Sequence, residues 1–358
     1  MADLPDAVSE ARRLLRAGRA ADAERLLRQR LATAPTDAVA LHELGLMARR
    51  ANRHDAALAL LERGAKAGGS AALWADLGTL RQESGDLSHA VEAYETALSL
   101  QPDWHAPRGN LAAALLKLGR HREALDAIEP LLVERPWHPY ALAYKALALW
   151  ELGQDRESLV LSGLDDLVFR AQLPSLQRAA VIDEIRRHPS LTASADPTRR
   201  AVRQGNVTGD LFQAPVTPAL AELRQSLDRF LAGWIPALPH RPHPWLAARP
   251  SRWKLIAWGN VLTGAGHQAP HIHNLGWLSG VIYLAVPPEI RPDDPSEGGW
   301  IEFGRPGYGL PTVRPPSVRS RAPGEGELLL FPSALWHATK PFTGTGERIS
   351  LAFDLAPV

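Results

Sequence analysis

The first half of this 358-residue chain repeats with a period of about 34 residues. A glycine or asparagine recurs at spacings of 34, 33, 34 and 34, and a small residue follows five positions after each one. Gly and Asn accept the left-handed turn between two helices, and small residues let paired helices approach closely. The pattern predicts a stack of helical hairpins. Its turn positions are Gly18, Asn52, Gly85, Gly119 and Gly153, and its small residues are Ala23, Ala57, Ala90, Ala124 and Ser158.

This repeat resembles the tetratricopeptide repeat, a helix-turn-helix unit of 34 residues. A partial unit at 5–35 precedes four full units, at 38–69, 71–102, 105–136 and 139–170. We therefore expect an α-helical solenoid over residues 1–170. The resemblance implies a concave groove that takes a peptide or protein partner. Alternatively, the residues assigned to the groove pack between helices or against the next domain; they are His42, Leu46, Arg49, Thr79, Gln82, Ala113, Leu116, Leu147 and Trp150.

Residues 171–358 are expected to form a second domain, rich in short strands. Apolar spacing predicts helices over 163–191 and 217–238, and the proline-flanked His240 and His243 are expected in solvated turns. Strands without intervening helices follow, which favours an antiparallel barrel or jelly roll. The candidate strands are 254–262, 269–273, 278–286, 300–304, 318–321, 327–331, 337–341 and 348–355.

Three histidines mark this strand-rich region. His271 and His273 are two residues apart on a predicted strand, so their side chains share one face. His337 follows an apolar strand, and Arg348 begins the last strand eleven residues later. Three imidazoles with a nearby guanidinium describe an open metal site that also holds a ligand bearing a carboxylate.

The ordered motifs resemble the Fe(II)/2-oxoglutarate-dependent dioxygenases over roughly residues 250–356. They read HIH, GWLSGVIYLAVP, GGWIEF, GEGELLLFPSALWH and ERISLAFD. The resemblance implies a double-stranded β-helix that binds Fe(II), O2 and 2-oxoglutarate. It assigns the metal to His271, His273 and His337, and the distal carboxylate of 2-oxoglutarate to Arg348. Further candidates for contact with the co-substrate are Ser350, Ser279, Tyr283 and Asn260.

His273 departs from the family pattern, which has a carboxylate ligand at this position. Either His273 binds the metal itself, or it lies beside the metal while a water completes the ligand set. Two other functions stay open. One is a three-histidine dioxygenase that does not use 2-oxoglutarate, and the other is a repeat-based scaffold with an inactive barrel.

Composition limits the partners. A net charge of +1 gives no electrostatic case for nucleic acid, and the absence of cysteine excludes disulfides and thiolate metal sites. No run of apolar residues has the length of a membrane span, so we expect a cytoplasmic protein. A solenoid joined to this barrel looks like the aspartyl/asparaginyl β-hydroxylases, which act on protein side chains. We therefore expect hydroxylation of a peptide or protein residue recruited by the repeats.

Overall fold

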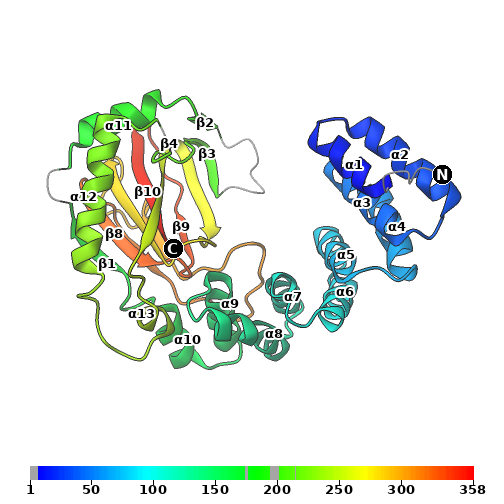
Figure 1. The fold of residues 1–358 in the computed structure, drawn as a ribbon. Helices are drawn as coiled ribbons and strands as arrows, with labels where there is room; N and C mark the ends of the chain where they lie inside the picture. The colour runs from blue at the N-terminus through cyan, green and yellow to red at the C-terminus, as the bar shows by residue number, and fades with distance from the viewer. Residues whose placement is uncertain (1–6, 174–175, 194–200, 214) are drawn as a thin grey trace. The chain divides into compact units, whose positions relative to one another are not determined.

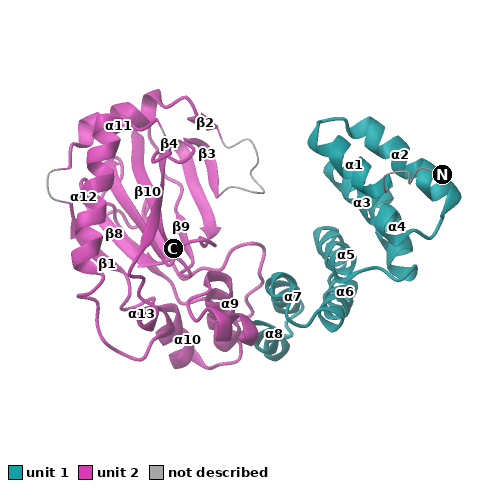
Figure 2. Ribbon diagram, in the orientation of Figure 1, with its two compact units in different colours: residues 1–128 teal, residues 129–358 magenta. Residues whose placement is uncertain are grey.

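The computed structural model describes residues 7–173, 176–193, 201–213 and 215–358. The chain divides into two compact units, Met1–Ile128 and Glu129–Val358, shown in teal and magenta in Figure 2. Each unit is described by itself. Among the described helices, none is both long enough and apolar enough to cross a membrane.

The first unit consists of helical hairpins, as the repeat predicts (Figure 1). Gly18 and Asn52 have φ values of 75° and 55°, so the turns adopt the left-handed conformation expected for them. Ala23 and Ala57 are fully buried where paired helices meet. The hairpins are α1 (Ala7–Arg16) with α2 (Ala20–Thr33), α3 (Ala38–Arg50) with α4 (His54–Lys66), α5 (Ala71–Glu83) with α6 (Leu87–Leu100), and α7 (Ala106–Lys117) with α8 (His121–Glu134), which runs into the second unit.

The last hairpin of the repeat array belongs to the second unit. It comprises α9 (Pro139–Glu151) and α10 (Asp155–Ser162), joined at Gly153 with φ 77°. The repeat motif places the domain boundary at residue 170, whereas packing divides the chain between residues 128 and 129. Trp150, assigned to the groove by the sequence, donates its indole N–H to the Pro315 carbonyl at 3.2 Å. This residue packs against the sheet-bearing part, as the alternative interpretation of the groove residues expected.

The rest of the second unit is a curled antiparallel sheet, consistent with a jelly roll. The strand order is β1-β8-β5-β10-β4-β9-β6-β7, with β3 paired to β4 and β2 to β3. The strand predicted over 254–262 and most of that predicted over 269–273 are parts of one strand, β4. It continues for 19 residues and pairs first with β10 and then with β9. The strands are β1 (Phe169–Gln172), β2 (Thr192–Ala193), β3 (Val202–Val207), β4 (Trp253–His271), β5 (Leu278–Ala285), β6 (Ile301–Phe303), β7 (Arg319–Arg321), β8 (Glu327–Pro332), β9 (His337–Thr339) and β10 (Glu347–Pro357).

Helices cover one face of this sheet. Leu223 and Leu227 of α12 (Pro218–Trp234) share a buried cluster with Leu351 and Phe353 of β10. Side chains alternate along a strand, so the residues between these on β10 point to the opposite face, away from the helices. That opposite face carries Arg348, Ser350 and Asp354, which are all buried.

Two expectations upstream of the sheet are wrong. The predicted helix over 163–191 forms only as α11 (Arg178–Arg187), because Phe169–Gln172 instead pairs with β8 and satisfies its edge. His243 does not lie in a solvated turn. It is 4% exposed, and its Nδ1 accepts the Trp245 N–H at 3.1 Å to cap the short helix α13 (Pro244–Ala247).

Candidate metal centre

Three histidines come together at the end of β4 and the start of β9. The ladder pairs His271 directly with His337, and His273 lies two residues further along the chain. One ring nitrogen from each residue lies within 4.8 Å of the other two. Nε2 of His271 and Nε2 of His273 are 3.2 Å apart. Within the described residues, no carboxylate belongs to this group.

Hydrogen bonds fix the tautomer of each ring. Nδ1–H of His271 donates to the Ala269 carbonyl at 2.8 Å, and Nδ1–H of His337 donates to the Leu335 carbonyl at 3.0 Å. Nδ1–H of His273 donates to the Asp354 carboxylate at 2.6 Å. In the neutral form of each ring, Nε2 is therefore unprotonated and offers its lone pair to a metal. Lone pairs that face one another at this distance repel unless a cation lies between them, which fits a bound metal.

The surroundings keep the rings of His271 and His337 neutral. Burial lowers the pKa of His271 to about 3, and the neighbouring His273 ring adds to the shift. Burial also holds the pKa of His337 well below its ordinary value, with further contributions from the other two rings. Metal ligands must be deprotonated, so these two histidines are ready to bind at neutral pH without losing a proton.

Arg348 is a buried cation. It is 1% exposed, and its Nε–H donates to the Gly299 carbonyl at 3.1 Å. Its guanidinium lies 5.0 Å from the centre of the Tyr283 ring. Over the part of the chain that the structure describes, no carboxylate pairs with it. The two carboxylates on its own strand bind elsewhere, Glu347 to Arg186 and Asp354 to His273. An unpaired buried charge costs about 3–5 kcal/mol. The position therefore suits an anionic ligand.

The other candidate residues line up across three strands. Ser350 of β10 lies opposite Asn260 of β4 on one side and Tyr283 of β5 on the other. All three are at most 1% exposed. Asn260 Oδ1 and the Tyr283 hydroxyl have no hydrogen-bond partner of standard geometry. Burial raises the pKa of Tyr283 to about 12, so its hydroxyl remains a donor at neutral pH. Beside Arg348, this row offers polar atoms to a ligand.

Both halves of the chain match known protein families. Residues 256–354 match the family described as "Putative 2OG-Fe(II) oxygenase". Residues 8–72, 71–103 and 110–159 match tetratricopeptide repeat families. The chain joins tetratricopeptide repeats to a domain that matches this 2OG-Fe(II) oxygenase family.

Individual relatives cover parts of the chain. Cellulose synthase operon protein C of Pseudomonas fluorescens (strain SBW25) is 29% identical over 193 residues, which are 51% of this chain and 14% of that protein. This chain therefore spans about one seventh of that protein's length. Among solved structures, YrrB, "a TPR protein with an unusual peptide-binding site", is 18% identical, with a TM-score of 0.41, over 44% of this chain and 81% of its own. A structure titled MamA AMB-1 is 26% identical, with a TM-score of 0.39, over 43% and 83%.

Asp354 of the oxygenase domain is a site residue that sequence reasoning missed. It is 7% exposed, and besides the His273 ring its Oδ1 accepts the Ser279 hydroxyl at 2.7 Å. Ser279 also lies 2.8 Å from the Ser333 hydroxyl. Ser279 therefore lies beside His273 rather than in the row with Tyr283. The signal available in the sequence was the period of two along β10, which puts Asp354 on the face of Arg348 and Ser350.

Proposed function

We propose that this protein is an Fe(II)- and 2-oxoglutarate-dependent dioxygenase that hydroxylates a residue of a peptide or protein substrate recruited by its repeats. One observation carries the proposal. Three imidazoles each place a ring nitrogen within 4.8 Å of the other two, and in the same sheet a buried arginine has no carboxylate partner among the described residues. A cation and a carboxylate would complete both halves of this arrangement.

His271, His273 and His337 would hold the metal. Imidazole is a suitable ligand for iron, and three protein ligands leave positions for a bidentate co-substrate and O2. Fe(II), with 2-oxoglutarate and O2, would supply the oxidising chemistry for hydroxylation of a C–H bond. The protein orients the imidazoles through their Nδ1–H hydrogen bonds. The Asp354 carboxylate accepts Nδ1–H of His273 and would add a negative charge behind that ligand, where the family pattern has a carboxylate ligand.

Arg348 would bind the distal carboxylate of 2-oxoglutarate. A guanidinium presents two parallel N–H groups to a carboxylate, and burial strengthens the contact by excluding water. The Tyr283 and Ser350 hydroxyls would donate to the same end of the co-substrate, and the Asn260 side chain would contact it. Ser279 would act through His273 and Asp354, which it touches.

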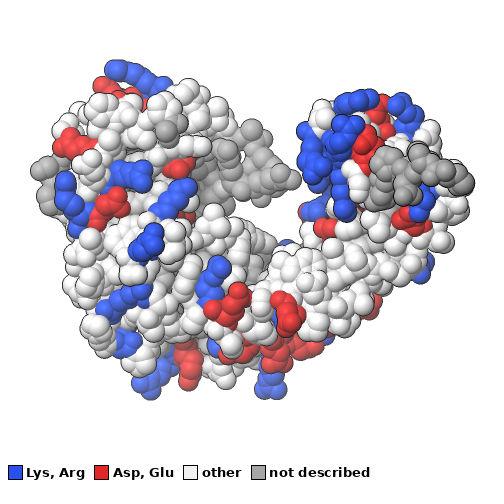
Figure 3. Space-filling model, in the orientation of Figure 1, with Lys and Arg blue, Asp and Glu red and all other residues white. Residues whose placement is uncertain are grey.

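The repeats would recruit the substrate. Tetratricopeptide arrays present a concave surface to peptides or proteins. The charged side chains do not argue for nucleic acid, because on the face of the second unit seen in Figure 3 Lys and Arg are scattered among uncharged residues.

Anaerobic titration of the Fe(II)-loaded protein with 2-oxoglutarate tests the assignment. We expect a new charge-transfer absorption band that saturates at one equivalent, and succinate formation once O2 and substrate are supplied. Tight Fe(II) binding with no spectral response to 2-oxoglutarate would instead favour the three-histidine dioxygenase. No tight binding of Fe(II) at all would leave the scaffold function.

A further inference from the structure

The segment 304–317 lies between β6 and β7, and we call it the strap. One end contacts the last helical hairpin of the repeats, and the other contacts Ile272, between His271 and His273. Its far end is fixed to α9 and α10. Besides the Trp150 contact with Pro315, the Val313 N–H donates to the Glu151 carboxylate at 3.1 Å. Arg314 pairs with Asp155 through Nη2 and Oδ2 at 2.9 Å. These contacts anchor the strap to the last helical hairpin.

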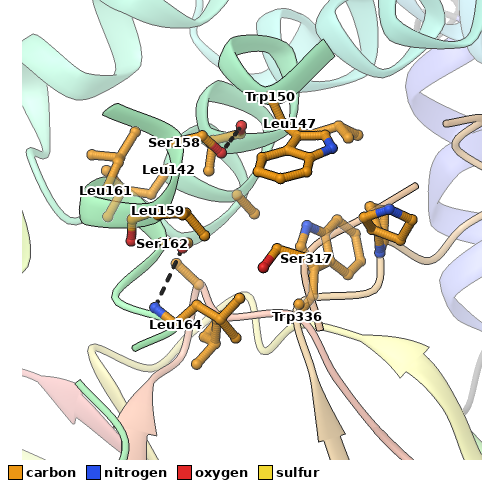
Figure 4. A pocket seen from close by; sticks show the side chains of 17 residues that line it. Leu142, Leu147, Trp150, Ser158, Leu159, Leu161, Ser162, Leu164, Ser317 and Trp336 are labelled. Atoms are coloured by element: carbon orange, nitrogen blue, oxygen red, sulfur yellow. Dashed lines mark hydrogen bonds between the residues drawn. The ribbon is translucent and has the colours of Figure 1, made fainter. Parts of the chain in front are cut away.

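A small apolar pocket of about 50 Å³ lies between this hairpin and the strap. Figure 4 shows Trp150 and Leu147 of α9 on one side of it, with Ser317 of the strap and Trp336 on the other. Trp336 directly precedes the candidate ligand His337, and its ring packs on that of Tyr308 at 5.2 Å. The near end of the strap therefore lies against the candidate metal centre.

At this near end, the Tyr308 hydroxyl forms hydrogen bonds with the backbone of Ile272, the residue between His271 and His273. Its hydroxyl accepts the Ile272 N–H at 3.2 Å and donates to the Ile272 carbonyl at 3.1 Å. Strand β4 ends at His271, so Ile272 has no ladder partner for these two groups. A hydroxyl can donate and accept at once, and here it replaces the neighbouring strand.

The backbone of the strap is shaped for this contact. Tyr308 has φ 57°, a conformation that side chains larger than glycine's rarely adopt. A Cβ on the preceding Gly307 would lie 1.9 Å from the Pro270 carbonyl oxygen, so only glycine allows the approach. On its other side, the Tyr308 ring packs on Tyr140 of α9 at 6.3 Å. The close approach at Gly307 and the positive φ of Tyr308 together hold the Tyr308 hydroxyl against Ile272.

We propose that Tyr308 is a positioning residue for the metal ligands: through Ile272 it sets the relative orientation of His271 and His273. The inference rests on the proposed function, because it assumes that these histidines bind metal. Both peptide groups of Ile272 are held, so neither peptide plane between the two histidines can turn without breaking a hydrogen bond. The last repeat, through the strap, holds Tyr308 in turn.

Replacing Tyr308 by Phe in the full chain tests this. The change keeps the ring and removes only the hydroxyl. We expect Co(II) and Fe(II), added anaerobically, to bind about 10-fold more weakly, the usual scale for residues that orient a ligand. We also expect the visible spectrum of the Co(II) form to change, because it reports ligand geometry. The matched control is Tyr144→Phe. It removes a hydroxyl from the same aromatic group, because Tyr144 packs on Trp336, and the hydrogen bonds described for the Ile272 peptide come from Tyr308.

The outcomes are separable. Wild-type metal affinity and an unchanged Co(II) spectrum in Tyr308→Phe would overturn the inference. An equal loss in Tyr144→Phe would also overturn it, because the effect would then be general packing. If the wild-type protein binds neither metal, or if His271→Ala binds as the wild type does, the proposed function itself fails.

Discussion

Replacing Asp354 by Asn is the sharpest test of how this site makes up for a missing carboxylate ligand. The Asp354 carboxylate accepts Nδ1–H of His273 at 2.6 Å and the Ser279 hydroxyl at 2.7 Å. Asn has the same shape, but its single carbonyl oxygen is neutral. A hydrogen bond to a charged group contributes about 1–2 kcal/mol more than one between neutral groups. Since that charge makes His273 a stronger electron donor, the loss should appear in metal binding.

We expect Asp354→Asn to weaken Fe(II) binding by about 30-fold, equivalent to about 2 kcal/mol. Anaerobic competition against a chelator of known affinity measures this directly. A thermal melt of the metal-free protein should accompany it, so that lost affinity is not confused with lost folding.

The control is a double variant. His273→Asp places a carboxylate directly in the ligand set, so the protein should no longer depend on the charge of Asp354. The pair His273→Asp with Asp354→Asn should therefore bind Fe(II) within a few-fold of His273→Asp alone. Unchanged affinity in Asp354→Asn, or an equal loss in both backgrounds, would refute the reasoning.

The remaining predictions concern the ligands themselves. His271→Ala and His337→Ala should each abolish tight Fe(II) binding, and unchanged metal stoichiometry in either would remove the proposed site. If His273 is a ligand, His273→Ala should lose iron while His273→Asp retains it; near-normal succinate formation in His273→Ala would place the ring outside the ligand set. Arg348→Ala should raise the 2-oxoglutarate requirement about 30–150-fold with metal binding nearly intact, because a charge-assisted contact contributes about 2–3 kcal/mol; unaltered co-substrate affinity would reassign it to structure. The metal-free protein should lose stability as pH falls from about 6.5 toward 3, because the unfolded chain then protonates His271, whose folded pKa is about 3, and a denaturant series across that range measures it.

The helical hairpins could be predicted because one spacing rule recurs in every unit. Gly85 and Gly119 occupy equivalent positions, with φ values of 82° and 72°, and a single misjudged residue would not have changed the period. No recurring pattern supports the prediction for Phe169–Gln172. Its apolar spacing also suits a helix, and only the open edge of β8, contributed by residues about 160 positions later, makes it a strand.

The candidate site divides in the same way. That His271 and His337 lie together could be predicted, because ligand chemistry restricts the residue types and their spacing. Asp354 and Tyr308 were missed because their roles depend on contacts far apart in the chain, 81 residues for Asp354 to His273 and 36 for Tyr308 to Ile272. An aspartate near the end of a strand and a tyrosine in a proline-rich loop resemble ordinary surface residues until the register is known.

The packing of α9 and α10 against the sheet has a consequence for the repeats. A helical solenoid ends in an exposed apolar face, and most arrays cover it with a dedicated polar helix. Here Leu164, just after α10, is 3% exposed and packs in one cluster with Tyr283 and Phe303 of the sheet. The sheet therefore covers the end of the array. The last repeat contributes side chains to the hydrophobic core of the sheet as well as to its own helical hairpin. Repeats could be added or lost nearer the N-terminus, but a junction cut at residue 170 would expose the interior of each part.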